Sequence, residues 1–233
     1  MSEQSVESVM IEIRTRLALM KQSLPTQLDA MAVSETAKIP FKALWYREAL
    51  FWRMAELGQS AFEHFETETL ASAVLLTRAT LETSAALWYF RAKVAAAVES
   101  GLMGDLHESL GKLIMGSKSD PQLPQAFNVM KFIDRVDKDV EGFRHQYERL
   151  CEFAHPNWAG TVLLYSKPGP EYRSMDFGAN ARGESARVSG VMNLSVALGI
   201  FELSYNQLSG LMPRFIALCE RDLAVGDSEA TGV

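Results

Sequence analysis

The stretch LASAVLLTRATLETSAALWYFRAKVAAAV, residues 70–98, is the least polar part of this chain. Its apolar residues are almost continuous over 71–76 and 85–90, so they cover most of the circumference of a helix instead of one stripe. Four charged residues leave no run of about 20 uncharged residues that could cross a membrane: Arg78, Glu82, Arg91 and Lys93. The sequence therefore predicts a central core helix, which Gly101 ends and around which the other elements pack.

Further helices are predicted on both sides of this core helix, because apolar residues recur at steps of three and four. The predicted helices cover residues 1–22, 40–65, 68–99, 106–115, 126–140, 142–154 and 184–223. Pro213 lies inside the last of them and is expected to kink or divide it.

The pattern changes after Pro156. The segment TVLLYS, residues 161–166, is rich in β-prone residues, a KPGPE turn follows, and residues 172–177 can pair back as a hairpin. We therefore expect an all-α fold: an up-and-down-like bundle of six to eight helices with a small β-hairpin near residues 161–177. The organisation predicted is one helical domain over residues 1–225 and a disordered tail over 226–233.

Composition narrows the cellular setting. The chain has 233 residues, a formal net charge of -6 and a pI of about 5.3, so binding to nucleic acid or to an anionic membrane would require a local basic patch. The two cysteines, Cys151 and Cys219, make no disulfide framework and suit a reducing compartment. The first residues, MSEQSVESVMIEI, lack the basic and apolar regions of a signal peptide. We expect a cytoplasmic protein that has no membrane partner.

The segment YERLCEFAHPNWAG, residues 147–160, concentrates polar groups at a helix end. His155 can exchange protons near neutral pH, and Arg149 can stabilise charge that develops on a phosphate. Together they could direct an RNA 2′-hydroxyl onto its own phosphate without a metal. Six positions along a helix place the two side chains about 120° apart, so they share a site only if the helix loosens before Pro156 or a second subunit contributes. In the competing interpretation Arg149 pairs with a carboxylate such as Glu152 or Glu148, and His155 caps the helix against its own dipole.

Two segments carry a resemblance to a known superfamily. LTRATLETSAALWYF, residues 76–90, and FRHQYERLCEFAHPNWAG, residues 143–160, resemble an uncharacterised group of bacterial helical proteins that is similar to the HEPN superfamily. The resemblance spans most of residues 40–220 and implies a dimeric, metal-independent ribonuclease. By the family's Arg and His motif, Arg149 would stabilise the phosphate and His155 would be the catalytic histidine.

Four other polar residues are candidates for supporting roles: Arg78, Glu82, Glu152 and Asn157. Arg78 and Glu82 stand four apart on one helical face, so they can form an ion pair that fixes the core or approaches the Arg149 and His155 region. Glu152 and His155 form the E-x-x-H step of carboxylate metal sites, but such sites need a second copy of the step, which this sequence lacks. We therefore expect no metal and no cofactor.

Two classes of function remain open. The first is metal-independent RNA cleavage, which requires Arg149 and His155 to converge on an accessible cleft within one chain or across a homodimer. The second is a non-catalytic helical interaction module, in bacterial defence or a stress response, with a protein partner that the sequence does not identify. The second class requires an exposed apolar patch instead.

Overall fold

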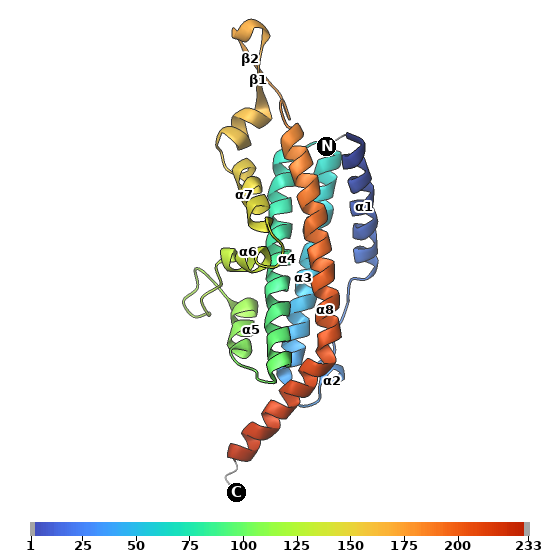
Figure 1. Cartoon of the computed structure of the whole chain (residues 1–233), viewed down its shortest axis with the longest axis vertical. Coiled ribbons are helices and arrows are strands. Elements are labelled where there is room, and N and C mark those ends of the chain that lie inside the picture. Colours follow the sequence, from blue (N-terminus) through green and yellow to red (C-terminus); the bar gives the residue numbers. More distant parts are fainter. Residues whose placement is uncertain (1–2, 231–233) are drawn as a thin grey trace.

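The computed structural model describes residues 3–230 and consists of a bundle of long helices with smaller helices on one side (Figure 1). The bundle comprises α1 (Glu3–Gln22), α3 (Lys38–Glu66), α4 (Leu70–Ser100) and α8 (Glu184–Ala230). A single turn, α2 (Ala30–Val33), lies in the connection between α1 and α3. The expected all-α helical bundle is confirmed.

A crossover of three shorter helices determines the direction of the last long helix. α5 (Leu106–Met115), α6 (Val129–Asp137) and α7 (Phe143–Ala154) pack on α4 and return along it to the end where α4 began (Figure 1). α1, α3 and α4 run alternately up and down, whereas α8 enters from the same end as α4. At the opposite end, Arg221 of α8 donates a hydrogen bond to the carbonyl of Gly101, the residue after α4, over 2.6 Å. α4 and α8 are therefore parallel neighbours.

α4 is the central helix of the fold. Neighbours on several sides cover it, because α3 and α8 pack on it from the bundle and α6 and α7 from the crossover. The continuous run 83–90 is buried throughout, as its sequence predicts. The helix ends at Gly101, whose φ of 71° is a left-handed conformation that favours glycine.

Close approach between α3 and α8 depends on a glycine. A Cβ atom built on Gly190 would lie 2.5 Å from Cζ of Phe65, and the ring of Phe65 is itself fully buried. Overlap of this kind forces either the ring or one helix to move, because protein interiors are close-packed. Gly190 thus sets how near α8 lies to α3 at this level.

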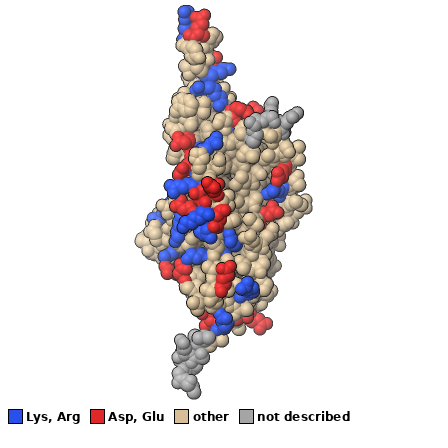
Figure 2. Space-filling model, in the orientation of Figure 1, with Lys and Arg blue, Asp and Glu red and all other residues tan. Residues whose placement is uncertain are grey.

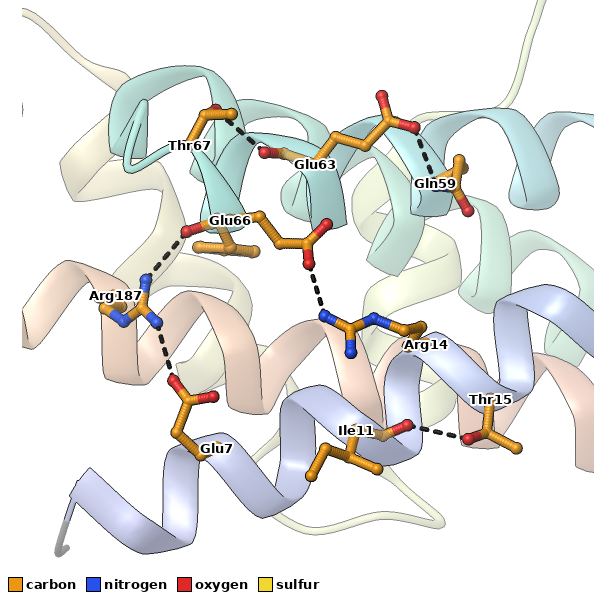
Figure 3. A network of polar contacts seen from close by, with 10 residues as sticks. Glu7, Ile11, Arg14, Thr15, Gln59, Glu63, Glu66, Thr67 and Arg187 are labelled. Atoms are coloured by element: carbon orange, nitrogen blue, oxygen red, sulfur yellow. Dashed lines mark hydrogen bonds and ion pairs between the residues drawn. The ribbon is translucent and has the colours of Figure 1, made fainter.

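Ion pairs and one backbone contact join α1, α3 and α8 at the same end of the bundle (Figure 3). Arg187 of α8 donates to the carbonyl of Phe65 over 2.9 Å and to the carboxylate of Glu7 over 3.4 Å. Arg14 of α1 pairs with Glu66 over 2.5 Å. The Arg187 contact adds a side-chain partner to the carbonyl of Phe65 at the C-terminal end of α3, which also accepts from the N–H of Glu68 over 3.4 Å.

The hairpin is present, but its strands are shorter than expected. β1 (Ser166–Pro168) pairs antiparallel with β2 (Met175–Phe177), and the 3-10 turn η2 (Pro170–Tyr172) lies between them. Residues 161–163 belong instead to a π-helical turn, η1 (Trp158–Leu163), so the β assignment of this part of TVLLYS was wrong. The side chain of Asn157 accepts a hydrogen bond from the N–H of Gly160 over 3.0 Å and caps this turn. Such local side-chain bonds outweigh β propensity here.

Residues 158–177, which we name the arm, begin with η1 beside one end of the bundle and continue into the hairpin, which projects beyond that end (Figure 1). At the other end, α8 continues through Pro213 without being divided, and its last part turns away from the bundle (Figure 1). α8 reaches Ala230, inside the segment 226–233 expected to be a disordered tail. Residues 231–233 lie outside the described residues, and the disorder of the tail stays a prediction.

One helix among residues 3–230 is long and apolar enough to cross a membrane by length and composition alone, namely Glu184–Ala224 of α8. Half of its most apolar window is buried inside the bundle. A core helix of a soluble protein has the same properties, so this finding is weak evidence for a membrane span.

Gly190→Ala should lower the free energy of unfolding by about 1–3 kcal/mol, because the added methyl group overlaps the ring of Phe65. Gly210→Ala is the matched control on the same helix, since a Cβ there meets nothing within 4 Å. That control should instead gain about 0.5–1 kcal/mol of helix stability. Urea unfolding followed by circular dichroism measures both, and equal effects would contradict the role given to Gly190.

Candidate functional site

α7 positions the polar segment singled out in the sequence. Its buried side comprises Phe143, Tyr147, Leu150 and Phe153, which recur at helical spacing. His155 is the C-cap residue: its N–H still donates to the carbonyl of Cys151 over 3.1 Å, with φ of -86° and ψ of 150°. The chain therefore leaves the helix only after His155, where Pro156 prevents a further helical turn.

Arg149 faces away from the core. It lies about 200° around α7 from the buried Tyr147 and is exposed. Its side chain lines a pocket of about 420 Å³ between α7 and the first turns of α8. The other lining residues are Gln146, Glu184, Ser185, Val188, Ser189 and Met192.

The carboxylates expected to pair with Arg149 have other partners. Glu148 accepts from Arg144 over 2.9 Å, and Glu152 accepts from the amide of Asn157 over 2.8 Å. In the part of the chain that the structure describes, no hydrogen bond or ion pair engages the Arg149 guanidinium. Its charge therefore remains available to an external anion.

His155 is exposed but does not line the Arg149 pocket. Because α7 keeps its helical path up to His155, the two side chains remain about 120° apart. Among the described residues 3–224, no hydrogen bond joins the side chains of Arg149 and His155. One chain alone therefore does not bring Arg149 and His155 into one site, and a shared site would need a second copy.

Arg78 and Glu82 form the expected ion pair, with 3.2 Å between Nε of Arg78 and Oε1 of Glu82. A third residue, Tyr147, joins them from α7. Its hydroxyl donates to Glu82 over 2.8 Å and accepts from Nε and Nη2 of Arg78 over 3.2 and 3.1 Å. The arginine also lies over the tyrosine ring, 5.4 Å from its centroid. This cluster meets α7 on the face opposite Arg149, so it links α4 to α7 instead of supporting that arginine.

Burial controls the ionisation of the groups around this cluster. It raises the pKa of Tyr147 well above the usual value, and the hydrogen bond to Glu82 raises it further, while Arg78 opposes both. Burial also raises the pKa of the neighbouring Cys151 thiol, against the attraction of Arg78. Cys151 is therefore a protonated thiol near neutral pH, which is a poor nucleophile.

Glu152 and Asn157 connect α7 to the arm. The amide of Asn157 donates to Glu152 while its carbonyl oxygen caps η1, so one side chain joins two consecutive helical turns. Among the described residues, no group of three or more His, Cys, Asp or Glu side chains is placed to hold a metal ion. The two residues thus have a structural role in this chain.

Charges near α6 and α7 are mixed in sign (Figure 2). Arg144 pairs with Asp134 over 2.9 Å, and Arg135 pairs with Asp139 over 2.7 Å. The indole N–H of Trp88 also donates to Asp139, and Arg135 and Trp88 together lower the pKa of that carboxyl. These pairs tie α6 to its neighbours and leave no continuous basic track for RNA on this part of the surface.

Two features of the site were not predicted from the sequence. Tyr147 belongs to the apolar stripe of α7, which predicts only burial. Its hydroxyl has a partner there because Arg78 lies opposite it on α4. The second feature is the exposure of aromatic residues on the arm, because β-prone residues were expected to pair in a hairpin. The alternation of aromatic and turn residues over 158–177 was the available signal.

Comparisons with known proteins do not assign the chain to a family. The chain matches no family model, no curated protein and no solved structure. Similarity to the HEPN superfamily therefore stays a prediction that rests on the two segments quoted above.

Tyr147→Phe should lower the free energy of unfolding by about 1–2 kcal/mol, because Arg78 loses two hydrogen bonds and Glu82 loses one. Since the pKa of folded Tyr147 lies above the unfolded value of about 10, the wild type also loses stability as the pH rises above 10. The variant should lose less over that range. Urea unfolding at pH 7 and between pH 9.5 and 11 measures both effects.

Tyr172→Phe is the matched control, since this hydroxyl belongs to a residue that is 87% exposed. Its stability should remain within about 0.5 kcal/mol of the wild type at each pH. An alkaline slope in Tyr147→Phe as steep as that of the wild type would show that Tyr147 titrates equally in both states.

Proposed function

We propose that this chain is a non-catalytic helical interaction module, whose arm binds the arm of a second copy. The observation that carries the proposal is the exposure of large apolar side chains on the arm. They are Trp158 (61%), Val162 (42%), Tyr165 (43%), Tyr172 (87%), Met175 (47%) and Phe177 (82%). Exposed apolar surface in this density is typical of interaction sites.

The area of this surface is close to that of a stable dimer. A buried aromatic side chain removes roughly 150–250 Å² from water, so the exposed parts of the four arm aromatics offer about 500 Å². A standard interface buries about 800 Å² on each partner, and the two aliphatic residues with the polar rim supply the difference. Tyr and Trp are also the residue types that most often dominate binding energy.

Charge on the arm favours a second copy over an anionic partner. Residues 158–177 contain two basic residues, Lys167 and Arg173, and two acidic ones, Glu171 and Asp176, so the arm is neutral although the whole chain carries -6. Lys167 and Asp176 are partners across the hairpin, and Arg173 lies 3.3 Å from Glu171. A symmetric interface places the same patch on both subunits, and a neutral patch with both signs can match its own copy.

The double variant Tyr172→Ser and Phe177→Ser should separate the copies. Sedimentation equilibrium should give twice 25.9 kDa for the wild type and 25.9 kDa for the variant, with the dissociation constant raised at least about tenfold. Leu102→Ser is the matched control, because Leu102 is 70% exposed but lies outside the arm. A monomeric wild type at 100 μM, or a variant as dimeric as the control, would refute the proposal.

Metal-independent RNA cleavage is the second candidate function. It is favoured by the exposure of Arg149 and His155 and by the absence, within the described residues, of an intrachain partner for the guanidinium. We propose that such a site would be completed across the dimer, with Arg149 stabilising the phosphate and His155 transferring the proton. No step of this reaction needs a metal or another cofactor.

Cleavage of single-stranded RNA in EDTA at low salt tests this second candidate. The wild type should cleave, and His155→Ala should lose at least about 100-fold in rate, as for removal of a general acid or base. His107→Ala is the control, because His107 is an exposed histidine on α5. Cleavage that persists equally in His155→Ala would exclude a catalytic role for His155. An inactive wild type would leave the interaction module as the remaining candidate function.

We also place the protein in the cytoplasm, in bacterial defence or a stress response. Support for the compartment comes from Cys151 and Cys219, which are both free thiols and at least partly buried. Burial raises the pKa of the Cys219 thiol to about 12, so this group also resists reaction. A reducing compartment suits such cysteines.

A further inference from the structure

A second candidate site lies in the bundle, away from the arm. It is a pocket of about 410 Å³ where the C-terminal half of α1 meets α3 and the middle of α8. Apolar residues make up much of its wall: Leu19, Met20, Phe51, Leu198, Phe201 and Tyr205. Sites for small molecules have volumes of about 300–1,000 Å³ and are mostly apolar with a few polar groups, which describes this pocket.

Three aromatic rings form the base of the pocket. The centroids of Phe51 and Tyr205 are 4.9 Å apart, those of Phe51 and Phe201 6.0 Å, and those of Phe201 and Tyr205 6.3 Å. Phe51 and Phe201 are themselves buried, so the core fixes their rings. The accessible apolar surface of the pocket comes instead from Leu19, Met20 and Tyr205, against which an apolar group could pack.

Two charged residues of α3, Arg47 and Glu48, hold Tyr205 in place. Its hydroxyl donates to Glu48 over 2.8 Å, and the guanidinium of Arg47 lies 4.5 Å from the ring centroid. Burial raises the pKa of Tyr205 to about 12, so the hydroxyl stays neutral. Arg47 and Glu48 also pair with one another, and neither of them lines the pocket.

Two charged residues line the pocket, Arg16 and Glu202, and a third, Glu12, lies beside it as a partner of Arg16. Arg16 pairs with Glu12 over 2.7 Å and lies 3.7 Å from Glu202. Its guanidinium rests against Gly199, where a Cβ would lie 3.2 Å from Nη1. One arginine thus serves two carboxylates, and Glu202, whose side chain is 62% exposed, keeps most of its capacity to accept hydrogen bonds.

We propose that this pocket binds a small aromatic amine, with the ammonium group on Glu202 and the ring against Leu19, Met20 and Tyr205. An anionic ligand would have to displace Glu12 or Glu202 from Arg16, whereas an ammonium group adds a partner without breaking a pair. Aromatic faces also attract cations. The site goes beyond the proposed self-association, because its lining residues share none with the arm.

Isothermal titration calorimetry with two matched probes tests the proposal. 2-Phenylethylamine and 3-phenylpropionate share the phenylethyl group and differ in charge. At low ionic strength the amine should bind at least tenfold tighter than the carboxylate. Glu202→Gln should weaken amine binding about five- to tenfold and should fold normally, because the side chain is exposed. Glu56→Gln, an exposed residue of α3 outside the pocket, is the matched control and should change amine binding less than twofold.

Asn206→Trp provides an independent variant, since Asn206 is exposed at the pocket and an indole there would fill it. It should abolish binding of the amine. Equal affinity for the two probes, an undiminished affinity in Glu202→Gln, or no binding by the wild type at millimolar concentration would each overturn the proposal. Sedimentation of the same samples separates this outcome from failure of the arm to self-associate.

Discussion

The fold depends on the burial of α4. A helix that is apolar almost all round can be covered only if other elements surround it. α3 and α8 cover it from the bundle, and α6 and α7 cover it from the crossover. The crossover has a topological consequence, because it returns the chain to the end where α4 began and makes α8 parallel to α4. The arm, the Arg149 pocket and the pocket between α1, α3 and α8 all owe their positions to this arrangement.

Burial of α4 also favours a partner for each polar group on it, and the hydroxyl of Tyr89 and Nε of Arg91 are the two buried exceptions among the described residues. Its buried threonine and serine hydroxyls bond within the helix: Thr77 donates to the carbonyl of Ala73 over 2.8 Å, and Thr80 donates to that of Thr77 over 2.7 Å. Charged residues cannot be satisfied in this way and reach other helices instead. Arg78 and Glu82 meet Tyr147, which explains why an apolar helix tolerates an ion pair and how α7 is held at one register. The cluster that resembles an active site in composition therefore acts as a link between layers.

Periodicity predicted the helices because their apolar stripes are set by local spacing, and the boundaries at Gln22, Gly101 and Met115 agree with it. The strand predicted over residues 161–163 was wrong, because hydrogen bonds of Asn157 and its neighbours determine the conformation there and the spacing of apolar residues does not reveal them. The Arg149 and His155 pair shows how far a site can be predicted from the sequence. Their separation in sequence gives their angular separation on α7, but which neighbours surround each of them is a tertiary property. Likewise the residues that line the pocket between α1, α3 and α8 come from three helices far apart in sequence, and no short motif marks them.

The two proposed functions are linked by the place of the arm in the chain. The arm begins at Trp158, three residues after His155, and Asn157 fixes the turn between them through Glu152 and Gly160. The surface proposed for self-association and the histidine proposed for catalysis are therefore neighbours in the chain. Self-association does not require catalysis, whereas catalysis by this pair requires a second copy. The arm is thus the more fundamental of the two features.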